Sequence, residues 1–197
     1  MLASSSPYRR GLLERLGLPF TCVRPDADEA PQTGESFGRT AQRLAELKAR
    51  AVAPRFPDAL IIGSDQVASC AGKRMDKPGT HVNAFRQLQH MSGQTARFDT
   101  AVCVLDTASG TLAARSVPCD VRFRELSDAV IEEYLRREQP YDCAGSAKSE
   151  GLGIALIAAM RTDDPTSLIG LPLIALTELL AQLGQPVLGP GFRGVQR

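Results

Sequence analysis

Residues 59–66 read Ala-Leu-Ile-Ile-Gly-Ser-Asp-Gln, and this stretch decides the fold class. A continuous apolar run of this length is typical of a strand that is buried on both faces. The run leads into Ser64-Asp65-Gln66, so we expect Asp65 at the carboxyl end of the strand. Open α/β sheets bind ligands at such ends, where a carboxylate can bind a divalent metal or activate a water molecule. Asp65 is therefore a candidate catalytic residue, with a capping aspartate in a tight turn as the alternative.

A helix is predicted just before this strand, from about residue 38 to residue 52. Helical spacing places Lys48 on a stripe that is otherwise apolar and comprises Ala41, Leu44, Ala45 and Val52. A lysine on an apolar face either extends its ammonium to solvent or pairs with an anion. The chain is rich in arginine and has only four lysines, which are Lys48, Lys73, Lys77 and Lys148. A lysine kept in such a chain indicates that a compact ammonium is needed, so Lys48 is a second candidate.

The amino-terminal segment combines a short predicted strand at residues 1–3 with a serine trio and Pro7. Serine followed by proline is typical of a helix start, with Ser6 as the N-cap and Pro7 in the first turn. Arg9 and Arg10 then lie where cations oppose the helix dipole. A phosphate bound at the helix N-terminus would explain that placement, and two solvated arginines are the alternative.

Strands and helices alternate along the rest of the chain, which predicts an α/β fold. Further strands are predicted at 20–23, 100–105, 116–123 and 154–158, and further helices at 81–91, 128–139 and 172–183. A hairpin near Ala71-Gly72 and a turn at Ser109-Gly110 rule out a uniform βαβ ladder. We expect one domain over residues 1–197, with a loose tail after about residue 186.

Composition restricts the class of ligand. The formal net charge is +1, with 23 basic and 22 acidic residues, whereas a nucleic-acid binder usually has a basic excess. The most apolar stretch, residues 168–183, contains Pro172 and Glu178 and is too short to span a bilayer. We therefore expect a cytoplasmic protein that binds a small anionic ligand, and neither nucleic acid nor membrane.

Cysteine and histidine usage argues against two kinds of site. The five cysteines are dispersed without CxxC spacing, which argues against a disulfide framework and structural zinc. We expect them to be small buried core residues in a reducing compartment. His81 and His90 are the only histidines, so a Ser-His-Asp triad has little support.

Several short segments, taken in order, resemble the Maf family of nucleoside-triphosphate pyrophosphatases. The matching segments are 2–10, 28–29, 44–48, 62–66, 77–78, 92–93, 144–146 and 170–172. No single segment is specific, but an ordered set of them is hard to obtain by chance. The resemblance implies an α/β fold with an elongated mixed sheet flanked by helices, and two lobes around a substrate cleft. It also implies a homodimer that depends on a divalent cation such as Mg or Mn.

The resemblance further implies roles for the candidate residues. Water would attack between the α and β phosphates of a nucleotide, with Asp65 as the proton acceptor. Glu29 would help Asp65 to hold the metal, although Glu29 in its acidic loop could equally be a surface residue. Three cationic side chains would bind phosphates with help from one serine; these are Arg9, Lys48, Lys77 and Ser5.

Three positions subdivide the family, and in this chain they hold Tyr8, Gln66 and Glu150. The branch that cleaves dTTP and UTP has Arg, Thr and Gln there, so this chain looks like the 7-methyl-GTP pyrophosphatase branch. That branch usually has Trp where Tyr8 stands. N7-methylguanine is cationic, which favours an aromatic face and a carboxylate. Glu150 would accept two N–H bonds from the Watson–Crick edge of the base.

Two other functions fit the same resemblance. One is a pyrophosphatase that acts on dTTP, UTP or a broad set of modified nucleotides. The other is not enzymatic, because members of the family have been linked to blocking septum formation. A protein of that second kind would sense a nucleotide and act on a partner protein.

Overall fold

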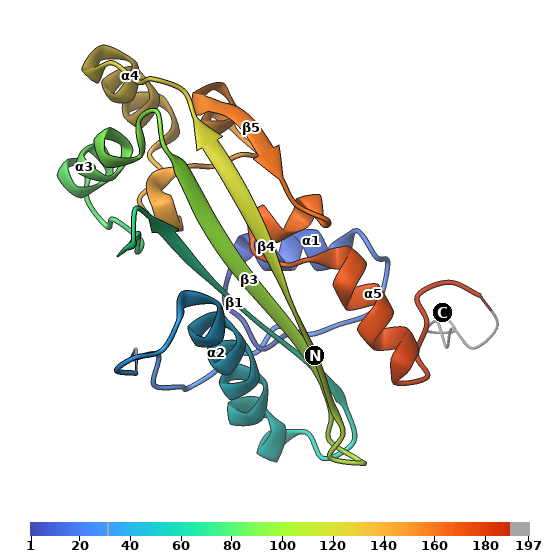
Figure 1. Ribbon diagram of the computed structural model, residues 1–197. Helices are drawn as coiled ribbons and strands as arrows, with labels where there is room; N and C mark the ends of the chain where they lie inside the picture. Colours follow the sequence, from blue (N-terminus) through green and yellow to red (C-terminus); the bar gives the residue numbers. More distant parts are fainter. Residues whose placement is uncertain (31, 190–197) are drawn as a thin grey trace. The chain divides into compact units, whose positions relative to one another are not determined.

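The computed structural model describes residues 1–30 and 32–189 and confirms an α/β fold (Figure 1). Its sheet has the strand order β2-β1-β3-β4-β5. The strands are β1 (Leu60–Cys70), β2 (Lys73–Arg74), β3 (Thr95–Asp106), β4 (Leu112–Phe123) and β5 (Ile157–Arg161). The α-helices are α1 (Pro7–Glu14), α2 (Phe37–Val52), α3 (His81–Met91), α4 (Asp128–Glu138) and α5 (Leu173–Gln182). The 3-10 helices are η1 (Ala53–Arg55), η2 (Ala144–Ser146), η3 (Leu152–Leu156) and η4 (Pro165–Ile169).

The pairings established within the five-stranded sheet are antiparallel, and the parallel component of the expected mixed sheet is limited to isolated bridges. β1 pairs with β2 and β4 pairs with β5 in antiparallel register, whereas Leu2 makes isolated parallel bridges to Cys22 and to Ile62. The predicted strands at 1–3 and 20–23 are wrong, because the two segments contribute only isolated bridges and no strand. The predicted strand at 154–158 is also misplaced, since η3 covers most of that segment and β5 begins at Ile157.

The chain divides into two compact units, in line with the two expected lobes. The first unit contains Met1–Asp65, Thr100–Val117 and the described residues from Asp164 onward. The second unit contains Gln66–Asp99 and Pro118–Asp163. The strands β1, β3 and β4 each contribute residues to both units. The expected cleft stays a prediction.

The core of the first unit lies between its strands and two helices, α1 and α5. Ile62 points from β1 into this core, which also contains Leu12 and Leu13 of α1 and Leu176 of α5. Figure 1 shows α2 on the opposite side of the strands from α5. Since side chains alternate along a strand, Ile61, Gly63 and Asp65 face α2 when Ile62 faces α1 and α5. This alternation puts Asp65 on the side of α2.

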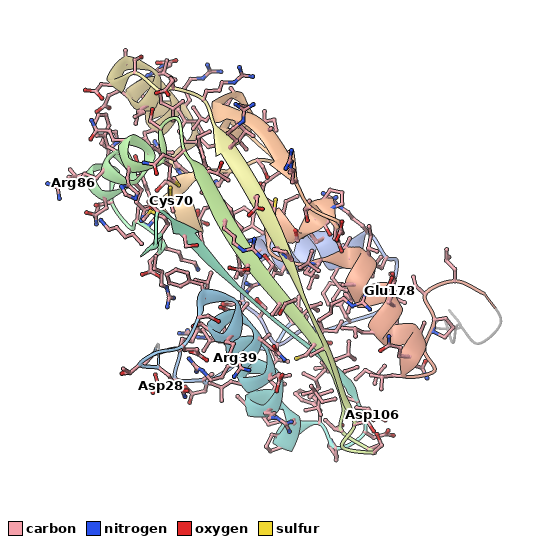
Figure 2. All side chains as sticks on the ribbon, in the orientation of Figure 1. Asp28, Arg39, Cys70, Arg86, Asp106 and Glu178 are labelled. Atoms are coloured by element: carbon pink, nitrogen blue, oxygen red, sulfur yellow. The ribbon has the colours of Figure 1, made fainter. Side chains whose placement is uncertain are left out.

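The ends of several elements follow the local signals in the sequence. Ser6 and Ser127 accept hydrogen bonds from the backbone N–H groups three residues later and so cap α1 and α4. Asp106 holds the turn between β3 and β4, since its carboxylate accepts bonds from the Ala108 N–H at 3.0 Å and the Ser109 hydroxyl at 2.6 Å (Figure 2). None of the helices in the described part of the chain is long and apolar enough to cross a membrane.

Two expectations concern particular residues. Cys70, Cys103 and Cys119 are buried as expected, but Cys22 is exposed and Cys143 is half-buried. Burial raises the pKa of Cys103 to about 12, so this thiol is inert. The predicted tail begins with bends at 187–189, and the rest of it lies outside the described residues.

Candidate active site

Helix α2 approaches β1 so closely that only glycine fits at residue 63. A Cβ atom built on Gly63 would lie 2.1 Å from the carbonyl oxygen of Ala45 and 3.0 Å from the Cβ of Ala49. The Cys103 thiol donates a hydrogen bond to the same Ala45 oxygen at 3.4 Å. Lys48 lies about one helical turn after Ala45, on the face of α2 that meets the strand. The small residues therefore bring the lysine to β1.

We expect Gly63→Ala to destabilise the first unit and to lower activity in the molecules that remain folded. The added methyl collides with a backbone carbonyl, so α2 must move away from β1. Overpacking of this kind costs about 1–3 kcal/mol or more. Chemical denaturation and activity per folded molecule measure the two effects. Gly110→Ala is the control, because a Cβ there meets no atom within 4 Å. The positive φ of Gly110 adds some strain in that control, so equal losses in both variants would contradict the expectation.

Lys48 forms a buried ion cluster with two carboxylates. Its Nζ donates to Asp65 Oδ1 at 2.5 Å and to Glu29 Oε2 at 2.9 Å. The side chains of Lys48 and Asp65 are 7% and 9% exposed, whereas that of Glu29 is 55% exposed. Lys48 is thus paired with anions and does not extend to solvent. Its position on an apolar face predicted this contact correctly, and its phosphate-binding role stays a prediction.

The predicted place of Asp65 at a strand end is wrong. Asp65 lies in the middle of β1, which continues to Cys70. The polar residue before it does not end the strand, because the Ser64 hydroxyl is hydrogen-bonded to the carbonyl oxygens of Ala101 at 2.8 Å and Gly170 at 2.9 Å. The side chain of Asp65 nevertheless faces a cation, and that pairing, not the strand end, makes it a catalytic candidate.

Arg9 is fixed beside this cluster. Its Nε donates to the carbonyl oxygen of Gly170 at 2.8 Å. Burial lowers the pKa of Arg9, and the charges of Asp65 and Glu29 oppose that shift. The alternative of a solvated arginine is therefore wrong for Arg9. It is correct for Arg10, which is exposed and pairs with Glu14 one turn along α1 at 3.0 Å.

The loop that carries Glu29 is anchored to α2 by Arg43. This guanidinium donates two bonds of 2.9 Å to the Glu35 carboxylate and one of 3.1 Å to the carbonyl oxygen of Ala30. Asp28, labelled in Figure 2, accepts a bond from the Ala30 N–H at 3.0 Å. Both contacts fix Ala30, the residue next to Glu29. Arg43 is therefore a positioning residue, which was not predicted from the sequence.

The Arg43–Glu35 pair should make stability depend on pH. The hydrogen bond from Arg43 is the largest cause that lowers the pKa of Glu35 from 4.5 to about 2. Because the folded-state pKa is the lower one, the stabilisation is complete above pH 4.5 and is lost as the pH falls towards 2. We expect the melting temperature of Glu35→Gln to lie below that of wild type at neutral pH and to approach it in acid. A gap of constant size across that range would contradict this origin.

The donor set of the cluster fits a divalent cation that also binds phosphate. Mg²⁺ is usually held by one or two carboxylates and completed by substrate phosphates and water. Glu29 and Asp65 supply two carboxylates around one ammonium. Within residues 1–30 and 32–189, no three His, Cys, Asp or Glu side chains form a group that could hold a metal. Two carboxylates alone therefore suit a cation that is bound mainly together with a nucleotide.

The other predicted residues are distributed over both units. Ser5 is exposed and Tyr8 is half-buried at the start of α1, in the first unit. Three more predicted residues belong to the second unit, where Gln66 is half-buried and Lys77 and Glu150 are exposed. Their roles stay predictions.

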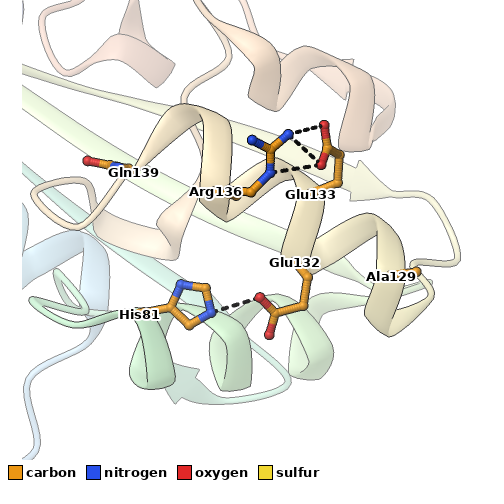
Figure 3. A pocket seen from close by; sticks show the side chains of 6 residues that line it. All are labelled: His81, Ala129, Glu132, Glu133, Arg136 and Gln139. Carbon is orange, nitrogen blue, oxygen red and sulfur yellow. Dashed lines mark hydrogen bonds and ion pairs between the residues drawn. The ribbon is translucent and has the colours of Figure 1, made fainter.

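A pocket in the second unit has a different character (Figure 3). It is lined by His81, Ala129, Glu132, Glu133, Arg136 and Gln139. Its polar side chains contact one another, since His81 lies 2.9 Å from Glu132 and Arg136 pairs with Glu133 at 2.8 Å. None of the predicted site residues lines it, so the candidate active site remains the cluster around Lys48.

Comparison with known proteins agrees with the family resemblance. The family described as "Maf-like protein" matches residues 1–183. A protein of Methylobacillus flagellatus named 7-methyl-GTP pyrophosphatase is 58% identical over 188 residues, which cover 95% of this chain and 98% of the relative. Proteins of the same name from Paraburkholderia xenovorans and Nitrosococcus oceani are 56% and 54% identical. These two alignments cover 96% and 95% of this chain, and 94% of each relative.

Proposed function

The chain belongs to the Maf family, and from that premise we propose that it hydrolyses 7-methyl-GTP to 7-methyl-GMP and diphosphate. The observation that carries the proposal is the buried contact between Lys48 and Asp65. Full-length relatives named for this activity support the substrate. We propose that residues 1–197 form one Maf-like domain that contains both units.

Hydrolysis requires a base and a neutralised phosphate chain. Asp65 accepts a proton from the attacking water, whose oxygen bonds to phosphorus. The anhydride bond between the α and β phosphates breaks, and its electron pair leaves with diphosphate. Lys48 orients Asp65 through their hydrogen bond and, like Arg9 and Lys77, would bind phosphate oxygens. Ser5, exposed just before the α1 N-terminus, adds a hydroxyl to the same anion site.

Glu29 and Asp65 would hold a divalent cation such as Mg²⁺ or Mn²⁺, which neutralises phosphate charge when it is bound. The protein itself contributes the orientation of both carboxylates. Lys48 contacts each of them, and Arg43 fixes the chain next to Glu29. Family membership also supports a homodimer that acts on free nucleotide in the cytoplasm.

Three residues would select the base. Tyr8 would stack on the cationic purine, Glu150 would bind its N1 and N2 hydrogens, and Gln66 would contribute to the choice of base. The deciding experiment measures diphosphate release from 7-methyl-GTP, dTTP, UTP and GTP, and compares kcat/KM. The highest value for 7-methyl-GTP is expected. A preference for dTTP or UTP would support the other enzymatic function, and no turnover on any nucleotide would support a nucleotide sensor.

Glu150→Gln should reduce the preference for 7-methyl-GTP over dTTP. The substitution keeps the shape of the side chain but replaces one acceptor by a donor that faces the base. A mismatched polar contact costs about 1–3 kcal/mol, so the ratio of kcat/KM values should fall about 5- to 150-fold. Adding Tyr8→Arg and Gln66→Thr should move the preference further towards dTTP or UTP. An unchanged ratio in the triple variant would refute this assignment of the three residues.

A further inference from the structure

The loop that carries Glu150 is attached to α4 at both ends. At its start, the hydroxyl of Tyr134 accepts a hydrogen bond from the backbone N–H of Lys148 at 3.1 Å. At its end, the carboxylate of Glu138 accepts one from the N–H of Leu152 at 2.8 Å. Tyr134 and Glu138 are one helical turn apart, so they present both acceptors on the same face of α4.

The two attachments are joined by an ion pair. Lys148 Nζ lies 3.6 Å from Glu138 Oε1, so Glu138 contacts both the first and the penultimate residue of the segment 148–153. The side chains of Lys148 and Glu138 are 19% and 17% exposed. An ion pair shielded to this degree is weakened less by solvent and salt than the exposed pairs elsewhere on α4.

Two glycines of the loop lie where neighbouring atoms leave no room for a Cβ atom. A Cβ on Gly153 would lie 2.4 Å from the carbonyl oxygen of Lys148, so the loop closes on its own backbone. A Cβ on Gly151 would lie 2.7 Å from Glu138 Oε2, so the Glu138 carboxylate packs directly against the residue after Glu150. Glycine therefore lets the Lys148 backbone approach residue 153 and lets the Glu138 carboxylate approach residue 151.

We propose that Glu138 is a positioning residue, which clamps the loop at 148–153 to α4 and so fixes Glu150 for base recognition. This inference rests on the proposed function for the role of Glu150, whereas the clamp itself rests on contacts within the second unit. Glu138 does not need to touch the substrate. Its loss should alter the discrimination between nucleotides, because discrimination depends on where the Glu150 carboxylate is held.

The first test compares Glu138→Ala with Glu133→Ala. Glu133 is the matched control, since it lies on α4 and pairs with Arg136 on that helix. We expect Glu138→Ala to lower the kcat/KM ratio of 7-methyl-GTP over dTTP about 5- to 100-fold, and Glu133→Ala to leave it unchanged. Glu138→Gln keeps an acceptor for the Leu152 N–H but loses the ion pair, so its ratio should be intermediate. Equal losses on both nucleotides in Glu138→Ala would overturn the specificity role.

The second test does not depend on any substrate. Hydrogen exchange of the backbone amides at 148–153 should be faster in Glu138→Ala than in wild type or Glu133→Ala, because local opening becomes easier. Unchanged exchange would overturn the clamp. If the wild-type enzyme prefers another nucleotide, the proposed function fails. Hydrogen exchange at 148–153 then still tests the clamp. The ratio of kcat/KM for the preferred nucleotide over that for GTP tests the specificity role.

The third test uses the contact between Gly151 and Glu138. Gly151 has a negative φ, and the three atoms nearest to a Cβ built there all belong to the Glu138 carboxylate. Gly151→Ala should displace that carboxylate and reproduce the loss seen in Glu138→Ala. Adding Gly151→Ala to Glu138→Ala should then cost little more. Fully additive losses in the double variant would mean that Gly151 acts independently of Glu138 and would overturn the proposed clamp.

Discussion

Asp65→Asn is expected to keep the fold and to lower turnover about 10²- to 10⁴-fold, the contribution of general base catalysis. The asparagine oxygen can still accept the hydrogen bond from Lys48 that the Asp65 carboxylate now accepts at 2.5 Å. The amide cannot take a proton from water, and it is a poorer metal ligand than a carboxylate. Lys48 keeps Glu29 as an anionic partner, so the substitution does not leave the ammonium alone. We therefore expect Asp65→Asn to lower turnover strongly while the protein stays folded.

A matched control exists on the same sheet. Asp99 is a poorly exposed aspartate of β3 that pairs with Arg97 at 3.1 Å, and nothing places it in the active site. Asp99→Asn makes the same chemical change and should leave kcat within about 3-fold of wild type, as expected for a residue outside the site. Steady-state turnover and thermal unfolding of both variants decide the matter. If Asp65→Asn is folded and retains more than about a tenth of wild-type turnover, Asp65 is not the general base.

Local sequence signals predicted the helices well. Ser6 and Ser127 mark the starts of α1 and α4 through hydrogen bonds that they accept from backbone N–H groups three residues later. Such contacts are readable from spacing alone, since capping and dipole effects act within one turn. The same holds for the hairpin at Ala71-Gly72, where both residues have positive φ.

The strands were predicted less well because their partners are distant in sequence. The strand was predicted to end at Ser64-Asp65-Gln66, yet the Ser64 hydroxyl is hydrogen-bonded to the carbonyl oxygen of Gly170, 106 residues away, and the strand continues. Cys22 looked like part of a strand, but only one bridge, to Leu2, forms there. Strand boundaries depend on which backbone groups find partners, and that information is not local.

Residues of the candidate site could be predicted where their surroundings in the sequence pattern are unfavourable for their type. A lysine on an apolar stripe is costly, so Lys48 could be identified and its anionic partner anticipated. Gly170 contributes only a backbone carbonyl to Arg9, and Glu138 looked like one of many surface charges on α4. Neither Gly170 nor Glu138 is marked by the composition of the chain or by its hydrophobic periodicity. Residues that position others were therefore missed, whereas residues in unfavourable surroundings were found.

Replacing Lys48 by methionine should lower both activity and stability, for reasons that can be separated. Lys48→Met keeps the length of the side chain but removes the ammonium that binds Asp65 and Glu29. Breaking a buried pair by removing one partner costs about 3 kcal/mol or more, because a carboxylate is left without compensation. Loss of one preorganised charge in the transition state costs about 2–4 kcal/mol, or about 30- to 1000-fold in kcat/KM. Lys73→Met is the control, since Lys73 is exposed on β2.

The double variant Lys48→Met with Asp65→Asn separates the cause of the lost stability from the cause of the lost activity. Removing the buried carboxylate together with the ammonium leaves no buried charge uncompensated, because the remaining carboxylate, Glu29, is 55% exposed. The free energy of unfolding should therefore recover much of what the Lys48→Met variant loses. Activity should stay at the level of Asp65→Asn, because neither a base nor the phosphate-binding cation is restored. Chemical denaturation and single-turnover rates at a temperature where every variant is folded measure both quantities. If Lys48→Met instead hydrolyses nucleotide at a normal rate per folded molecule, Lys48 is a structural residue, and the ion cluster stabilises the first unit without taking part in hydrolysis.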